Sequence, residues 1–182
     1  MIAKIVQKGN KVLRQIAKEV PVKDIKEKKI KDLIKKMSDV LSLAENGVAL
    51  AAPQIGESVR LFIIDKNALI PRRPTSSPDS PDVGRQRQKK KEKTDPWVFI
   101  NPVIKKISKK KQVVGEGCLS VEGMFGTVKR ADKLSVEAYD ENGKKFTRGA
   151  SGLLAQIIQH ETDHLNGIIF TDKAEILEKY KV

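Results

Sequence analysis

An amphipathic helix is the first element that the pattern of apolar and polar residues predicts. Between Ile30 and Ala44, apolar side chains recur at intervals of three and four residues while lysines fill the opposite face. This spacing gathers the apolar side chains on one side of an α-helix. Asp24 and Glu27 ahead of it resemble a capping box, and Asn46-Gly47 predicts its end. The apolar positions are Ile30, Leu33, Ile34, Met37, Leu41 and Ala44.

Short apolar runs typical of β-strands fill the middle of the chain. Residues 59–65 (VRLFIID) are rich in β-branched and apolar side chains, which predicts a buried strand. Asn142-Gly143 is the dipeptide that a tight hairpin favours, because both central positions need a positive φ. Further strands are predicted at residues 97–100, 103–107, 112–114, 127–129, 134–139 and 144–147.

A second helix is predicted over residues 151–165 (SGLLAQIIQHETDHL), where the helical spacing of apolar residues returns. Gly149 precedes it, and Asn166-Gly167 follows as a stop signal. Its apolar side chains cover much of the helix circumference, which predicts a central, buried position. The final segment, residues 172–182, is predicted to form a short charged helix.

The composition predicts a single domain with one basic insert. A chain of 182 residues with 39% apolar residues can bury one core, so residues 1–182 are predicted to form a single catalytic domain. Residues 71–93 cannot contribute to that core, because they hold four prolines and eight Lys or Arg residues against three acidic ones. The sequence therefore predicts a flexible basic insert at about residues 71–95.

Charge and cysteine content set expectations for partners and compartment. The net charge of +13 favours polyanions and could bring the protein to the ribosome surface, but no interleaved aromatics indicate specific nucleic-acid recognition. One cysteine and no signal or transit peptide predict a cytoplasmic protein of bacterial type, and the lack of a membrane-spanning run predicts no membrane association. The protein is expected to be a monomer.

His160, Glu161 and His164 form the motif HExxH, and they include both histidines of the chain. On a helix, an interval of four residues places both imidazoles on one face, where they can bind a single metal ion. Glu161 then lies beside the open position of the metal. The pattern indicates a mononuclear metal hydrolase with Glu161 as its catalytic carboxylate.

A hydrolytic metal site usually has three protein ligands. The motif supplies two of them and leaves the identity of the third undecided. The metzincin pattern would place a histidine at position 170, which is Phe170. A carboxylate from a later helix is disfavoured, because few residues follow His164 and their acids lie in one short segment. Cys118, in the stretch GEGCLS, is a plausible soft ligand, although a lone cytosolic cysteine is more often a small buried residue.

Three separated segments resemble the signature motifs of the peptide deformylase family, in the same order. Residues 47–54 (GVALAAPQ) resemble GxGxAAxQ, residues 116–120 (EGCLS) match literally, and residues 159–165 (QHETDHL) match QHExDHL. The resemblance implies an α+β fold with antiparallel sheets around a central helix that carries HExxH. It also implies removal of the formyl group from the formyl-methionine of nascent polypeptides, with release of formate.

The resemblance further implies roles for individual residues. Cys118, His160 and His164 would hold one divalent metal ion per chain, with Fe²⁺ expected natively and Zn²⁺, Ni²⁺ or Co²⁺ able to substitute. Gln54, through its side-chain amide, and Leu119, through its backbone N–H, would stabilise the oxyanion beside the catalytic Glu161. The candidate substrate-binding positions are Val48 and Ile157 for the methionine side chain, Ala49 along the substrate, and Gly47 and Glu116 as residues that shape the loops.

Two departures from the family pattern stand out. Ala49 replaces the second glycine of the first motif, which adds a methyl group and restricts φ. The tail after Asp172 is shorter than the C-terminal helix that some bacterial members use at the ribosome. Two alternatives to a deformylase remain: a metallopeptidase, and a basic RNA- or ribosome-binding protein with a structural metal site.

Overall fold

The computed structural model of the chain describes residues 3–44, 46–69 and 95–179. The basic insert expected at about 71–95 therefore lies outside the described residues, except for Asp95. Within these ranges, the chain forms two α-helices, eight strands and five short 3₁₀ helices. The helices are α1 (Lys28–Leu43) and α2 (Gly152–Leu165); the strands are β1 (Ala49–Ala51), β2 (Leu61–Ile64), β3 (Trp97–Ile107), β4 (Lys111–Cys118), β5 (Val121–Ala131), β6 (Lys133–Tyr139), β7 (Lys145–Ser151) and β8 (Ala174–Lys179).

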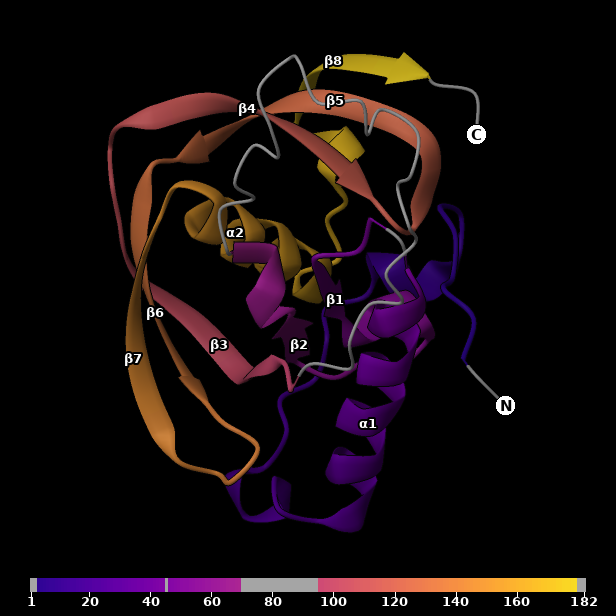
Figure 1. The fold of residues 1–182 in the computed structure, drawn as a ribbon, viewed down its shortest axis with the longest axis vertical. Coiled ribbons are helices and arrows are strands. Elements are labelled where there is room, and N and C mark those ends of the chain that lie inside the picture. The colour runs from indigo at the N-terminus through magenta and orange to yellow at the C-terminus, as the bar shows by residue number, and fades with distance from the viewer. Residues whose placement is uncertain (1–2, 45, 70–94, 180–182) are drawn as a thin grey trace, which may run out of the picture.

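The strands form two sheets, and the neighbouring strands in both are antiparallel. The larger sheet has the order β1-β2-β3-β6-β7, and the smaller has the order β4-β5-β8. Helix α2 contacts strands of both sheets, whereas α1 contacts β1 and β2. Figure 1 shows α2 between the two sheets and α1 beside β1 and β2. The predicted antiparallel α+β architecture is confirmed.

Strand β2 is covered by apolar side chains on both faces of the larger sheet. Phe62 and Ile64 belong to the cluster of buried side chains that includes Ile158 of α2. Leu61 and Ile63 belong to the cluster formed with α1. Because alternate residues of a strand face opposite sides of a sheet, a strand covered on both faces reads as an unbroken apolar run.

Strand β3 joins two strands that the sequence pattern separates. The apolar runs 97–100 and 103–107 belong to one strand, whose register with β6 shifts between Ile100 and Val103. Asn101 lies at this irregularity with φ +51°, and Pro102 follows it without an N–H to donate. The side chain of Asn101 accepts the backbone N–H of Val20 and donates to its carbonyl oxygen, which fixes the irregularity in β3.

Two local predictions are wrong. The C-terminal segment is strand β8, which pairs with β5 from Met124 to Val128, and not a charged helix. The capping box does not form either: Asp24 ends a 3₁₀ turn, and α1 begins at Lys28 after Glu27, which makes no side-chain cap. Within the described residues, no helix is long and apolar enough to span a membrane.

Candidate metal centre

Helix α2 and the end of strand β4 bring three potential metal ligands together. His160 and His164 lie one turn apart on α2, with ring centroids 5.0 Å apart. Cys118 is the last residue of β4, and its Sγ lies 3.2 Å from Nε2 of His164. One ligand atom from each of the three residues lies within 4.8 Å of the other two. The sulfur and the two imidazole nitrogens thus converge on one point.

Glu116 fixes the orientation of His160. Its Oε2 lies 2.9 Å from Nδ1 of His160, which leaves Nε2 as the ring nitrogen available to a metal ion. Burial lowers the pKa of His160, but the interactions with Cys118 and Glu116 outweigh it and raise that pKa to about 10. An environment that attracts a second proton so strongly also attracts a metal cation at the same nitrogen, so the residues fit a bound ion.

His164 is held as a neutral imidazole. Burial lowers its pKa well below the usual value, and the neighbouring His160 lowers it further. Its Nδ1 is buried and has no hydrogen-bond partner among the described residues. A neutral ring keeps a lone pair on Nε2, the nitrogen beside Cys118, which is the form that binds a metal.

Glu161 is a buried carboxyl group beside these ligands. Its side chain is 4% exposed, and its Oε2 has no hydrogen-bond partner within the described part of the chain. Burial raises its pKa to about 7. A carboxylate that ionises near neutral pH and keeps one free oxygen can take up and release a proton during a reaction.

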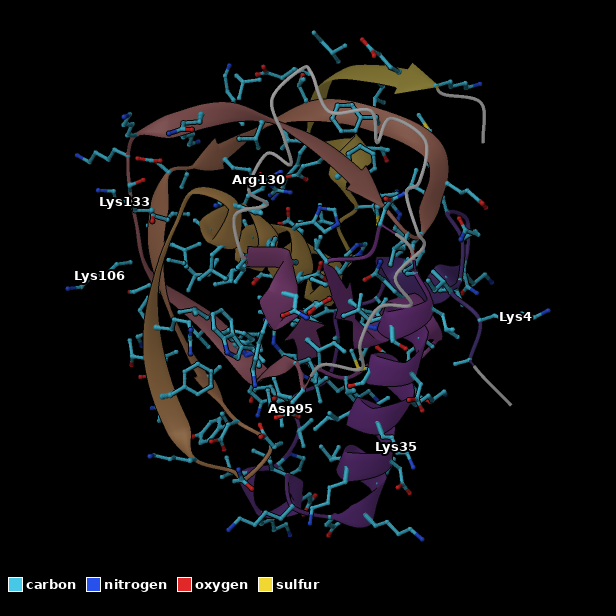
Figure 2. All side chains as sticks on the ribbon, in the orientation of Figure 1. Lys4, Lys35, Asp95, Lys106, Arg130 and Lys133 are labelled. Atoms are coloured by element: carbon cyan, nitrogen blue, oxygen red, sulfur yellow. The ribbon has the colours of Figure 1, made fainter. Side chains whose placement is uncertain are left out.

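A network of buried charges lies behind His160, and the sequence analysis did not find it. Arg130 on β5 donates to both carboxylate oxygens of Glu116, with Nε–Oε1 of 2.7 Å and Nη2–Oε2 of 2.9 Å. Its Nη1 donates to Asp163 at 2.6 Å, and Lys173 donates to the other oxygen of Asp163 at 2.6 Å. Figure 2 shows Arg130 close to α2. Arg130 therefore holds Glu116, the residue that orients His160, and is itself held by its second ion pair with Asp163.

One signal in the sequence could have revealed this arginine. Val128 and Arg130 are both buried and are separated by one residue of β5, whereas Lys129 between them is exposed. An arginine in the inward-facing register of a strand needs buried anionic partners. The predicted strand at 127–129 ended one residue too early to show it.

Gln54 is buried and held in a fixed orientation, unlike a surface loop glutamine. Its Oε1 accepts the backbone N–H of Ala51 at 2.8 Å. Its Nε2 therefore faces Ser120 and Cys118, at 3.3 Å from Oγ and 3.5 Å from Sγ. The backbone N–H of Leu119, between those two residues, makes no backbone hydrogen bond within the described chain. Two donors thus lie next to Cys118, one of the candidate metal ligands.

The candidate substrate-binding positions differ in their surroundings. Gly47 is buried, and a Cβ there would lie 2.8 Å from Cβ of Ala44 and 3.3 Å from Cδ1 of Leu119, so the position requires glycine. Val48 is 38% exposed, whereas Ile157 is buried among the apolar side chains of the larger sheet. Glu116 has both carboxylate oxygens engaged with Arg130 and His160.

Ala49 occupies an ordinary extended conformation. It lies in strand β1, paired with Ile64, and Asn101 is the non-glycine residue with positive φ in the described chain. Alanine adopts this backbone without strain, so the glycine of the family motif is not needed there for its conformational freedom.

The alternative third ligands lie elsewhere. Phe170 cannot ligate a metal, and its ring packs against that of the candidate ligand His160, with centroids 6.3 Å apart. Among the late acids, Asp172 pairs with Arg14, and Glu175 pairs with Lys129 at 2.7 Å. Within the described residues, the group able to hold a metal consists of Cys118 and the two histidines.

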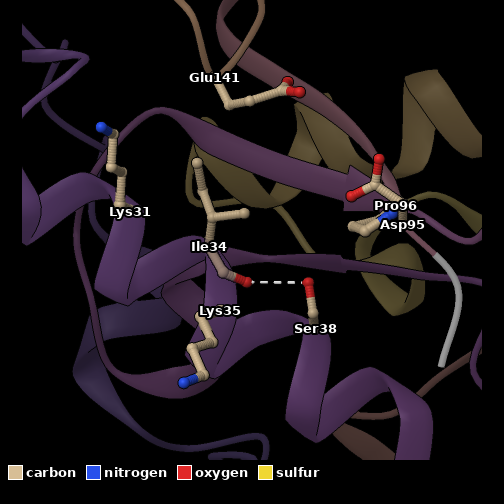
Figure 3. A pocket seen from close by; sticks show the side chains of 7 residues that line it. All are labelled: Lys31, Ile34, Lys35, Ser38, Asp95, Pro96 and Glu141. Atoms are coloured by element: carbon tan, nitrogen blue, oxygen red, sulfur yellow. Dashed lines mark hydrogen bonds between the residues drawn. The ribbon is translucent and has the colours of Figure 1, made fainter.

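A separate pocket of about 400 Å³ contains none of the candidate site residues. It lies between α1, the start of β3 and the turn after β6, and Figure 3 shows its lining residues, which include Lys31 and Lys35 of α1. None of the candidate metal ligands and none of the candidate catalytic residues lines it. Its lining residues are Lys31, Ile34, Lys35, Ser38, Asp95, Pro96 and Glu141.

The chain is similar to known proteins along almost its whole length. The family model for polypeptide deformylase matches residues 2–180. A peptide deformylase from Microchaete diplosiphon is 38% identical over 167 residues, which are 92% of this chain and 76% of that protein. A peptide deformylase structure from Legionella pneumophila matches with a TM-score of 0.77 and 36% identity, over 96% of this chain and 87% of that one. Another from Synechococcus elongatus, in complex with actinonin, matches with a TM-score of 0.75 and 32% identity, over 96% and 79%.

Proposed function

The chain belongs to the polypeptide deformylase family, and we propose that Cys118, His160 and His164 hold the metal ion of its reaction. It is a metal-dependent hydrolase that removes the formyl group from the N-terminus of newly synthesised polypeptides. Family membership decides against the metallopeptidase and the structural-metal alternatives. The convergence of one sulfur and two imidazole nitrogens within 4.8 Å is the observation that carries the assignment of the ligands.

The donor set suits a borderline divalent ion. A thiolate with two neutral imidazoles favours Fe²⁺, Zn²⁺, Ni²⁺ or Co²⁺ over hard ions such as Mg²⁺. We propose Fe²⁺ as the native ion, one per chain, with the others as substitutes. When bound, such an ion lowers the pKa of water and polarises a carbonyl group.

Glu161 is proposed as the general base and then the general acid. Its carboxylate accepts a proton from the attacking water as the C–O bond to the formyl carbon forms. It then delivers this proton to the amine nitrogen as the C–N bond breaks, so formate and a free N-terminal amine leave. A buried carboxyl with a pKa near 7 can perform both transfers at neutral pH.

Gln54 and Leu119 are proposed to stabilise the oxyanion. The amide of Gln54 is oriented by Ala51, so its Nε2 does not need to reorganise when charge develops on the carbonyl oxygen. The N–H of Leu119, which makes no backbone hydrogen bond within the described residues, supplies a second donor from the loop that follows Cys118. Preorganised donors of this kind contribute more in a buried site than in water.

The methionine side chain of the substrate is proposed to contact Val48 and Ile157. Val48 is partly exposed beside the site loop, and Ile157 lies one turn before His160 on α2. Gly47 supports this loop, because only a glycine fits between α1 and the side chain of Leu119. Ala49 is proposed to run along the substrate with its backbone.

Nascent formylated polypeptides are the substrate. We propose that residues 1–182 act as one domain, as a monomer, in the reducing environment of the cytoplasm, where the thiol of Cys118 stays available as a ligand. We also propose that the basic charge brings the protein to the surface of the ribosome.

The reaction is tested with a formylated tripeptide such as formyl-Met-Ala-Ser. The metal-loaded protein should release formate and leave Met-Ala-Ser intact. Methionine released without formate would instead establish a peptidase. A Cys118→Ala variant tests the proposed ligand set separately. It is expected to lose bound metal and, with it, formate release.

A further inference from the structure

We propose that a cluster of lysines at the far end of strand β4 binds the phosphate backbone of RNA. We call this cluster the lysine rim. It surrounds two adjacent connections, the one from β3 to β4 and the one from β5 to β6, and all of its side chains are exposed. Figure 2 shows Lys106 and Lys133 extending from the same side of the molecule. The lysine rim consists of Lys105, Lys106, Lys109, Lys110, Lys111 and Lys133.

Hydrogen bonds hold the two connections rigidly side by side. Ser108 donates its backbone N–H to the carbonyl of Lys133 at 2.9 Å, and its Oγ accepts the N–H of Lys133 at 3.1 Å. Asp132 donates its N–H to the carbonyl of Lys110 at 3.0 Å. Lysines from distant parts of the sequence are therefore presented together on a fixed backbone, which lowers the entropy that is lost when they bind.

Most of the positive charge of the lysine rim is not neutralised by the protein. Within the described residues, none of its six lysines forms an ion pair, whereas lysines elsewhere pair with acids. Asp132 lies between the connections and accepts a hydrogen bond from Gln112 at 2.7 Å, which leaves its negative charge in place. Glu137 on β6 pairs with Lys145 at 2.9 Å and also interacts electrostatically with Lys105. The six lysines outnumber these two acids, so the rim offers a net positive charge to a polyanion.

Chemistry favours phosphates of RNA over other anionic partners. The rim is built from lysines, which bind phosphate as point charges, and has no arginine fork for paired carboxylates. It has no aromatic side chain for stacking on bases, so binding is expected to follow the backbone and to ignore sequence. The choice of RNA rests on the proposed function, because the substrate is a newly made polypeptide and such chains emerge beside ribosomal RNA.

The position of the rim allows RNA binding and catalysis to occur together. Strand β4 runs from Lys111 to Cys118, and seven steps of about 3.3 Å place the rim roughly 23 Å from the metal ligand. RNA on the rim would leave the site free. Hydrolysis of short formylated peptides should therefore be independent of the rim.

Binding of a short RNA hairpin by the full chain, followed by fluorescence anisotropy at several salt concentrations, tests the proposal. One variant replaces four rim lysines with glutamine, and a matched control replaces four exposed lysines at and before the start of α1, which removes the same charge. The rim variant is Lys105→Gln, Lys106→Gln, Lys109→Gln and Lys110→Gln; the control is Lys23→Gln, Lys26→Gln, Lys28→Gln and Lys29→Gln.

The rim variant should bind RNA with a slope of log K against log salt reduced by about 3, because each lost phosphate contact removes about 0.7 to 0.9. At 0.1 M salt this amounts to a loss of up to about 10³-fold in affinity, while the control should lose far less. Both variants should release formate at the rate of the unchanged protein.

Three results would overturn the proposal. Equal losses in the two variants would show a general effect of net charge. Unchanged RNA binding by the rim variant would exclude the rim. Loss of binding to vesicles of phosphatidylserine and phosphatidylcholine, with RNA binding intact, would assign the rim to a membrane. If the fourfold variant does not fold, Lys106→Glu with Lys110→Glu tests the same surface with two changes.

Discussion

Replacing Arg130 with methionine removes the guanidinium that lies between two buried carboxylates. Glu116 and Asp163 would then lie close together in the protein interior, and Lys173 would be left as the cation for Asp163 alone. Removal of one partner from a buried ionic network costs about 3–5 kcal/mol of the free energy of unfolding. For a chain of this size, each kcal/mol corresponds to roughly 2–4 °C, so the melting temperature should fall by about 6–20 °C.

The same change should weaken metal binding, because Glu116 orients His160 only while Arg130 holds it. Loss of a group behind a metal ligand typically costs about 10- to 100-fold in affinity. Lys129→Met is the matched control, since Lys129 directly precedes Arg130 on β5 but lies on the surface and pairs with Glu175. An exposed pair contributes about 0–1 kcal/mol, so this control should remain close to the unchanged protein.

Thermal unfolding followed by circular dichroism, with and without chelator, measures the change in melting temperature. Competition with a metal indicator measures the change in metal affinity. A double-mutant cycle with Glu116→Gln should give a coupling energy between the two residues of up to about 3 kcal/mol. If Arg130→Met melts within the range of Lys129→Met and binds metal equally tightly, the network does not support the site.

Three further predictions follow from the site. Gln54→Ala should lower kcat by about 10²- to 10³-fold at unchanged metal content, measured by formate release; a small change would remove Gln54 from the oxyanion site. Ala49→Gly should leave kcat/KM nearly unchanged, because Ala49 already has an extended backbone; a large gain would show that the methyl group obstructs the substrate. Removal of the metal by chelation should lower the melting temperature, since an ion at about 100 times its Kd stabilises the fold by about 2.7 kcal/mol. Cys118→Ala should melt at the same temperature with and without chelator, and a retained shift would exclude Cys118 as a ligand.

Local patterns in the sequence were sufficient for the helices and for the motif on α2. The helical spacing before Gly47 predicts α1 within a few residues, and the stop at Asn166-Gly167 agrees with α2, where Gly167 has φ +74°. Elements with strong periodicity need no distant partner to be recognised. Cys118 was different, since its place beside His164 depends on the path of β4. The residues alone left it as either a soft ligand or a small buried residue, and the family resemblance favoured the ligand.

Strand β8 was predicted incorrectly because its conformation depends on a distant partner. Residues 174–179 (AEILEK) favour a helix locally, and Ile176 next to Leu177 fits no strand alternation. The exposed edge of β5 overrides this preference through pairing from Met124 to Val128. Gly126 permits the close approach, because a Cβ there would lie 2.5 Å from the carbonyl oxygen of Ile176.

Buried polar contacts were the least visible feature in the sequence. Arg130 and Asp163 are separated by 33 positions, and no periodicity links them. Phe170 replaces the third histidine of another metalloprotein class and packs against His160 instead. Such contacts depend on side chains that meet only after both sheets have enclosed α2.

The central claim, that Glu161 moves the proton at a metal held by Cys118, His160 and His164, is tested most directly by Glu161→Gln. The variant, purified without oxygen, should contain about one metal ion per chain, as the unchanged protein does, because the ligands are intact. It should release no formate from a formyl-methionyl peptide. Retained turnover at full metal content would contradict the role of Glu161, and loss of the metal would contradict the assignment of the ligands.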